Sequence, residues 1–190
     1  INRLFSVFYA FCIGIIAYMP LVFPFLINSQ YNAAYYQIPI LMLAVLFQAV
    51  VGLYSVIYVA LKKSKEIAKT SFFAAIINIG VDIALIKFIG LYAASISTLI
   101  AYAAMTIYRY FHIKKYVNVP LKHKVGFTLI MVIVLISYYL NKLPINLVMA
   151  VLVTIFAIVS NKDFVLGIIK IICNYGRKIL SLKYFSSIIT

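Results

Sequence analysis

The chain has 190 residues, of which 66% are apolar and 11% charged, and its formal net charge is +14. An average globular domain is about half apolar and about a quarter charged. Seventeen basic and three acidic residues cannot cover the surface of a soluble fold of this size. Composition therefore excludes a soluble domain and indicates a membrane protein. The positive charge would suggest nucleic acid in a soluble protein, but here we expect no nucleic-acid partner.

The three carboxylates, Glu66, Asp82 and Asp163, are far apart in the sequence. They are too few and too far apart in the sequence to indicate paired-carboxylate catalysis or a site that binds a hard metal ion. We therefore expect no enzymatic activity, no metal and no cofactor.

Six apolar runs follow one another along the chain. An α-helix rises about 1.5 Å per residue, so about 20 apolar residues cross a hydrocarbon core of about 30 Å. Four runs have about this length or more: residues 4–27, 38–61, 70–89 and 91–111. Two shorter runs, 125–140 and 145–160, are expected to form a hairpin whose flanking lysines reach the interface. The pattern predicts an all-α, polytopic membrane protein with six transmembrane helices.

Basic residues are distributed unevenly between these runs. Fifteen of the seventeen lie near the N-terminus, in or beside the connectors 62–69 and 112–124, or after residue 161. The other two, Lys87 and Lys142, lie near the alternate connectors. The positive-inside rule then predicts that both ends of this chain are cytoplasmic.

The segment 161–190 is apolar but too often interrupted to span a membrane. Lys170, Asn174, Arg177 and Lys178 recur in it at helical spacing. This spacing predicts a basic amphipathic helix on the cytoplasmic leaflet. Because the chain has neither an initiator methionine nor a signal peptide, we expect it to be the C-terminal fragment of a longer protein.

Polar side chains inside the apolar runs are the candidate functional residues, because an ionised group at the bilayer centre costs at least about 2.5 kcal/mol. Asp82 lies twelve residues into the run 70–89, slightly beyond the midplane, and Asn78 lies one turn before it. Lys87 is about 140° away around the helix and is poorly placed to neutralise Asp82. Asp82 therefore needs a partner on another helix, a bound cation or a proton. An interhelical hydrogen bond and a water-filled cavity with a coupling ion are both compatible with this position.

The run 91–111 carries a polar face of its own, with Ser95, Thr98, Tyr102 and Arg109 at spacings of three and four. Helix packing explains Ser95 and Thr98 as well as solute contact does. Arg109 is expected to extend to the cytoplasmic interface, with binding of an anionic group as the alternative. Gln48 begins a shorter polar stripe in the run 38–61. The expected substrate or ion pathway comprises Gln48, Asn78, Asp82, Ser95, Thr98, Tyr102 and Arg109.

Four short stretches occur in an order that resembles the C-terminal portion of Wzx-type polysaccharide flippases. They are Tyr35-Tyr36-Gln37-Ile38-Pro39-Ile40-Leu41, Lys62-Lys63-Ser64-Lys65, Ala74-Ala75 followed by Asn78, and Gly90-Leu91-Tyr92-Ala93-Ala94-Ser95-Ile96-Ser97-Thr98. The resemblance covers roughly residues 5–116, and the chain after Val117 is similar by hydropathy alone. This chain has Ala93 where the family usually carries a second glycine, and Asp82 where it often carries asparagine.

The resemblance implies a place in the multidrug, oligosaccharidyl-lipid and polysaccharide exporter superfamily, whose members have two six-helix lobes and work by alternating access. Residues 1–116 would then supply the last four helices of the second lobe, 117–160 an additional hairpin and 161–190 the tail. The implied substrate is an undecaprenyl-diphosphate-linked oligosaccharide, moved across a bacterial inner membrane. Membrane lipids, the missing N-terminal lobe and a polysaccharide polymerase complex are the implied partners.

Three other functions remain compatible with the sequence. A multidrug cation exporter of the same superfamily would use Asp82 as its cation site. A multi-pass envelope glycosyltransferase or acyltransferase would need a carboxylate or histidine at a membrane face, for which Glu66, His112 and His123 qualify. A non-transporting assembly subunit would need only the six spans.

Overall fold

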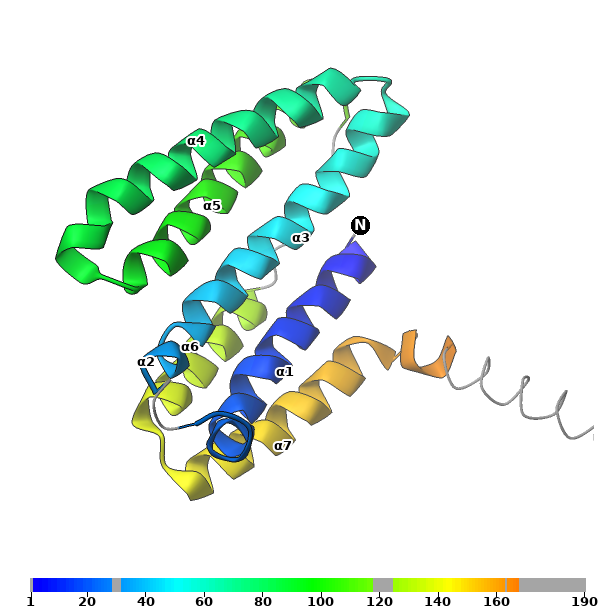
Figure 1. The fold of residues 1–190 in the computed structure, drawn as a ribbon. Helices are drawn as coiled ribbons and strands as arrows, with labels where there is room; N and C mark the ends of the chain where they lie inside the picture. Colours follow the sequence, from blue (N-terminus) through cyan, green and yellow to red (C-terminus); the bar gives the residue numbers. More distant parts are fainter. Residues whose placement is uncertain (1, 29–31, 118–124, 163, 168–190) are drawn as a thin grey trace, which may run out of the picture.

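The computed structural model describes residues 2–28, 32–117, 125–162 and 164–167, and every element in these ranges is a helix. The predicted all-α class is thus confirmed for the described residues. In chain order (Figure 1), the helices are α1 (Asn2–Leu26), α2 (Asn32–Tyr35), α3 (Ile38–Ala60), α4 (Ser64–Ile89), α5 (Tyr92–Lys114), α6 (Val125–Leu140) and α7 (Leu143–Ser160). The predicted tail helix falls almost entirely outside the described residues.

Four of these helices are long and apolar enough to cross a membrane: α1 from Arg3 onward, α3, α4 and α7. Helix α5 has 23 residues, but its hydroxyl groups and Arg109 make it more polar than those four. Helix α6 is apolar but has only 16 residues. The chain is therefore a helical membrane protein, and six crossings stay a prediction.

Local sequence explains where several helices begin and end. Pro39 and Pro144 stand in the first turns of α3 and α7, where a missing backbone N–H leaves no intrahelical bond unmade. Gly90 has φ of 55° and ends α4, so that α5 turns back directly. The short helix α2 was not predicted, and it lies in the uncharged connector between the first two long helices.

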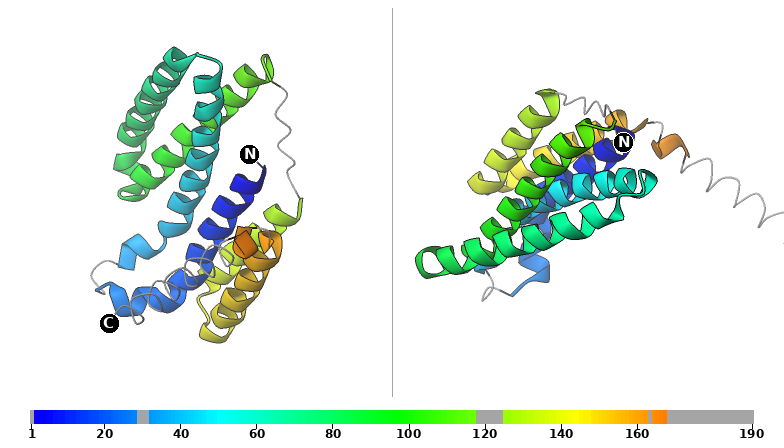
Figure 2. Two further views of the ribbon diagram at one scale, coloured as in Figure 1. Left: turned by 90° about the vertical axis from the view of Figure 1, so that its right-hand side faces the viewer. Right: turned by 90° about the horizontal axis from the view of Figure 1, so that it is seen from above.

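The long helices pack as two groups (Figure 2). In the first group α5 packs against both α3 and α4. In the second group α1 packs against α7 and α6, and a contact between α1 and α3 joins the two groups. The main apolar core lies in the second group, where Tyr9, Ile13 and Ile16 of α1 meet Val134 of α6 and Val153 of α7.

Helix α4 is the least covered of the four apolar helices. Only 6% of its apolar stretch is buried within the chain. Phe72, Phe73, Ile79 and Ile83 are all exposed on it. In a membrane this face meets lipid or a further protein segment.

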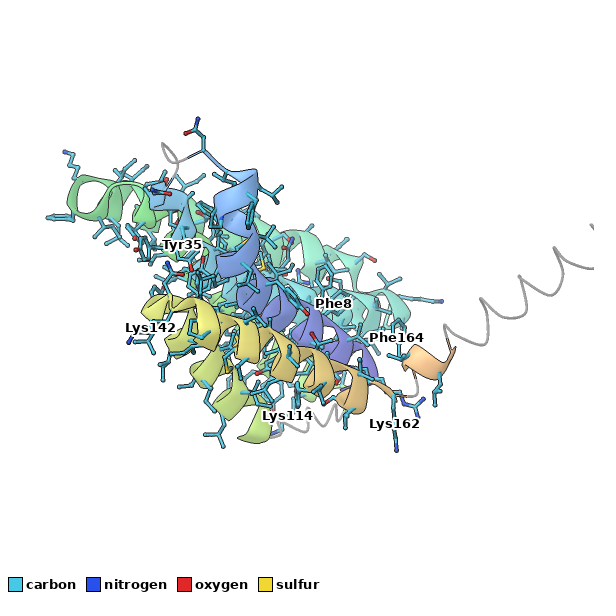
Figure 3. All side chains as sticks on the ribbon, turned by 90° about the horizontal axis from the view of Figure 1, so that it is seen from below. Phe8, Tyr35, Lys114, Lys142, Lys162 and Phe164 are labelled. Atoms are coloured by element: carbon cyan, nitrogen blue, oxygen red, sulfur yellow. The ribbon has the colours of Figure 1, made fainter. Side chains whose placement is uncertain are left out.

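The turns are sorted by charge along the bundle. The turn between α3 and α4, which carries Lys62 and Lys63, lies toward the same end as the close of α7 (Figure 1). Figure 3 shows Lys142 beside Tyr35 at one end of the molecule and Lys162 at the other. We call the end with the α3–α4 turn and Lys162 the basic end, and the opposite end the tyrosine end.

Candidate functional site

Arg109 lies inside the bundle, where α3, α4 and α5 meet, and only 1% of it is exposed. Its Nε donates to Thr70 Oγ1 at 3.0 Å, and its Nη2 donates to the same oxygen at 2.7 Å. Its Nη1 donates to Ser55 Oγ at 2.6 Å and to the carbonyl of Val51 at 3.1 Å. The expectation that Arg109 extends to the interface is therefore wrong, because helices α3 and α4 enclose its guanidinium.

Further bonds complete this group, which we call the Arg109 cluster: Arg109, Ser55, Thr70, Ser71 and the carbonyls of Val51 and Ile67. Nη2 also reaches Ile67 O and Ser71 Oγ, each at 3.3 Å. Among the described residues, every acceptor of Arg109 is a neutral hydroxyl or carbonyl oxygen. The guanidinium is thus a buried positive charge. Among the described residues it is stabilised by hydroxyl and carbonyl dipoles and not by a carboxylate.

The helix geometry explains why these side chains meet. Ser55 lies five residues before the end of α3, Thr70 six residues after the start of α4, and Arg109 five residues before the end of α5. At about 1.5 Å per residue, all three lie about 8 Å from the basic end. The hydroxyls of Ser55 and Thr70 donate to Val51 O and Glu66 O of their own helices, at 2.9 and 2.7 Å. Their lone pairs therefore remain available to accept from Arg109.

Asp82 does not take part in this cluster. It lies twelve residues beyond Thr70 on α4, which is about 18 Å along the helix toward the tyrosine end. Its Oδ1 is buried and has no hydrogen-bond partner among the described residues. Asn78 is half-buried one turn away, and Lys87 is exposed. Among the described residues, the interhelical hydrogen bond that the sequence left open for this carboxylate is therefore not formed at Oδ1.

Three of the other predicted pathway residues, Ser95, Thr98 and Tyr102, have local contacts. Ser95 is buried and donates to Tyr92 O at 3.0 Å, and Thr98 donates to Ala94 O at 2.7 Å. These bonds within α5 are those expected if the two hydroxyls serve helix packing. Tyr102 packs beside Val51, Ala74 and Met105, and Gln48 is exposed on α3. Among the described residues, no side-chain hydrogen bond joins any two of the predicted pathway residues.

Sequence reasoning missed two features of the site. It took Thr70 only as the start of an apolar run, although Thr70 is the central acceptor of Arg109. It also missed Tyr58, which is fully buried, with its hydroxyl 2.8 Å from Nδ1 of His112 and its ring centroid 5.8 Å from the guanidinium carbon of Arg109. The equal depth of Ser55, Thr70 and Arg109 from the basic end was a signal that could have found the cluster.

The described residues thus offer a buried guanidinium, several hydroxyls and one unpartnered carboxylate oxygen, and they contain no group of three side chains that could hold a metal ion. Comparison of the chain with protein-family models, with curated proteins and with solved structures gives no match.

Proposed function

We propose that this chain is the C-terminal part of a flippase that moves undecaprenyl-diphosphate-linked oligosaccharides across a bacterial cytoplasmic membrane by alternating access. The proposal rests mainly on one observation: Arg109 is a buried charge with no acidic partner among the described residues, in a helix group that includes two membrane-spanning candidates. Ionisable groups in such positions are costly and commonly belong to substrate or ion pathways. The resemblance of residues 5–116 to Wzx-type flippases supplies the substrate class.

A sugar-diphosphate headgroup needs hydrogen-bonding and cationic groups along its path, while its lipid tail stays in the bilayer. Arg109 lies about 8 Å inside the basic end, where an anionic headgroup would enter from the cytoplasm. The direct test is complementation of a flippase-null strain by the full-length gene, scored by surface polysaccharide. Failure of a well-expressed, correctly inserted protein to restore the polysaccharide would contradict this function.

We also propose six crossings with both ends of the chain in the cytoplasm. In a variant lacking Cys12 and Cys173, cysteines placed at Asn32 or Lys142 are expected to react with an impermeant thiol reagent added to intact cells from the periplasmic side. A cysteine at Lys63 is the control and should react only after the cells are opened. The connectors that contain Asn32 and Lys142 are predicted to be periplasmic, and the connector that contains Lys63 is predicted to be cytoplasmic. The reverse labelling pattern would therefore overturn the predicted orientation.

Replacing Asp82 with asparagine is expected to lower the transport rate about tenfold while the protein still inserts and folds. The reason is that Oδ1 of Asp82 has no hydrogen-bond partner among the described residues, so the change removes a carboxylate charge rather than a structural bond within this part of the chain. Transport of lipid-linked sugar into proteoliposomes, measured at several pH values, checks this result. Lys87→Gln is the control, since Lys87 is exposed on the same helix. An unchanged rate at every pH would make Asp82 structural.

The unpartnered carboxylate also favours a second candidate, a cation-coupled multidrug exporter in which Asp82 binds the exported or coupling cation. The two candidates differ in substrate. Drug efflux from cells that express the full-length protein, without any restored polysaccharide, would favour the exporter.

A further inference from the structure

A concave pocket of about 350 Å³ opens at the basic end, where the α3–α4 turn meets the last turn of α5. Every lining residue has a polar or charged side chain, although part of the lining is formed by the apolar portions of these side chains, and none of them belongs to the Arg109 cluster. The lining residues are Lys62, Lys63, Ser64, Lys65, Glu66, His112 and Tyr116. The lining carries three lysines and one glutamate, so its net charge is positive without any contribution from His112.

The backbone at Lys62 is held in a conformation that lysine disfavours. Lys62 has φ of 56°, in the left-handed region. Its N–H bonds Val59 O at 2.9 Å, and the N–H of Lys63 bonds Tyr58 O at 2.8 Å. This pair of bonds is the Schellman motif, in which glycine usually occupies the position of Lys62. Strained residues of this kind cluster at functional sites, and here the side chain of Lys62 lines the pocket.

The walls of the pocket are held in place by aromatic contacts. The Nζ of Lys63 lies 3.5 Å from the ring centroid of Tyr116. His112 stacks on Tyr108 with ring centroids 5.8 Å apart, and its Nδ1 is engaged by buried Tyr58. Since Nδ1 is occupied, Nε2 is the ring nitrogen that His112 can present to a ligand. Helix α4 begins at Ser64, so the positive end of its dipole also faces this region.

We propose that this pocket binds the phosphate group of a membrane lipid. A phosphate anion matches three ammonium groups and a helix N-terminus. The source of the phosphate follows from position: the pocket lies where the charged α3–α4 turn joins two membrane-spanning candidates, at the level of lipid headgroups. The assignment does not depend on translocation, because binding is measured without transport. It can therefore fail while the proposed function stands, and the reverse also holds.

The test uses the full chain in a neutral detergent, titrated with short-chain phosphatidic acid and read by native mass spectrometry. Wild-type protein is expected to bind this lipid saturably and phosphatidylcholine at least tenfold more weakly. Lys62→Gln with Lys65→Gln should weaken phosphatidic acid binding about tenfold or more. The matched control, Lys114→Gln with Lys115→Gln, removes the same charge from the end of α5 outside the pocket and should change affinity less than threefold. Equal losses in the two double variants would show a general surface effect and overturn the site.

A competition experiment shows whether the pocket prefers a lipid phosphate or a soluble phosphate anion. Inorganic phosphate should displace phosphatidic acid only at concentrations far above those of the lipid. If inorganic phosphate binds as tightly as the lipid, the lipid assignment is wrong.

Lys62→Gly separates binding from folding. Glycine relieves the left-handed strain, so we expect the unfolding temperature to rise by about 2–4 °C while phosphatidic acid affinity falls. A lower unfolding temperature would mean that Lys62 is kept for stability, which would contradict its role in the pocket.

Discussion

Replacing Arg109 with alanine is expected to lower the free energy of unfolding by about 3 kcal/mol. The guanidinium contacts α3 through Ser55 and Val51, and it contacts α4 through Thr70 and Ile67. Alanine removes all these bonds and leaves a cavity between three helices. Chemical unfolding of the purified protein in detergent, followed by circular dichroism, measures the change.

Two further substitutions at Arg109 separate shape from charge. Methionine fills much of the same volume, and the hydroxyls of Ser55 and Thr70 already donate to their own helices, so no donor is left unpaired. We therefore expect Arg109→Met to stay within about 1 kcal/mol of wild type. Lysine has a single ammonium, which cannot bridge α3 and α4 as the planar guanidinium does, so Arg109→Lys should be intermediate.

The matched control is Lys114→Ala, five residues further along α5 and exposed, which should change stability by less than about 0.5 kcal/mol. If Arg109→Ala unfolds at the wild-type denaturant concentration, the cluster does not hold the three helices together. If Arg109→Met is stable but inactive in transport, the buried charge serves function rather than folding.

The lengths of the apolar runs and the charges between them were sufficient to place the six longer helices, although not the short helix α2. The run 38–61 corresponds to α3 (Ile38–Ala60), and the run 125–140 corresponds to α6 (Val125–Leu140). Helices dominate here because an apolar stretch without water must satisfy its backbone groups internally. The start of α4 was placed six residues late because Lys65, Glu66 and Lys69 are charged, although they continue the helix from Ser64. Charge ends a membrane span without ending a helix.

The interior of the site was harder to predict. When each run is considered by itself, Arg109 is expected to extend to the cytoplasmic interface, because its helix ends five residues later at Lys114. Its real environment comes from Ser55 and Thr70, which are 54 and 39 residues away in sequence. Such contacts depend on which helix faces are turned together, and helical periodicity within one run does not determine this. Asp82 is the opposite case. Its sequence position singled it out as a residue that needs a partner, yet its Oδ1 has no hydrogen-bond partner among the described residues.

A tyrosine pair at the other end of the bundle gives the second large expected effect: Tyr138→Ala should lower the free energy of unfolding by about 3–5 kcal/mol. Tyr138 is 1% exposed, and its ring stacks on that of Tyr35 with centroids 4.4 Å apart. Its hydroxyl donates to Tyr35 O at 2.6 Å. Burial raises the pKa of Tyr35 to about 12, and the Tyr35 hydroxyl donates to Asn141 Oδ1 at 3.3 Å. The pair thereby fixes α2 against the end of α6.

The neighbouring Tyr139 provides the control on the same helix. It is 51% exposed, its ring lies 6.4 Å from that of Tyr36, and its hydroxyl bond to Tyr36 O is 3.4 Å long. Tyr139→Ala should therefore cost less than about 1 kcal/mol, and Tyr138→Phe, which keeps the ring but loses one hydrogen bond, about 1 kcal/mol. Equal destabilisation by Tyr138→Ala and Tyr139→Ala would show that tyrosine content at this end, rather than the buried Tyr35–Tyr138 stack, stabilises the bundle.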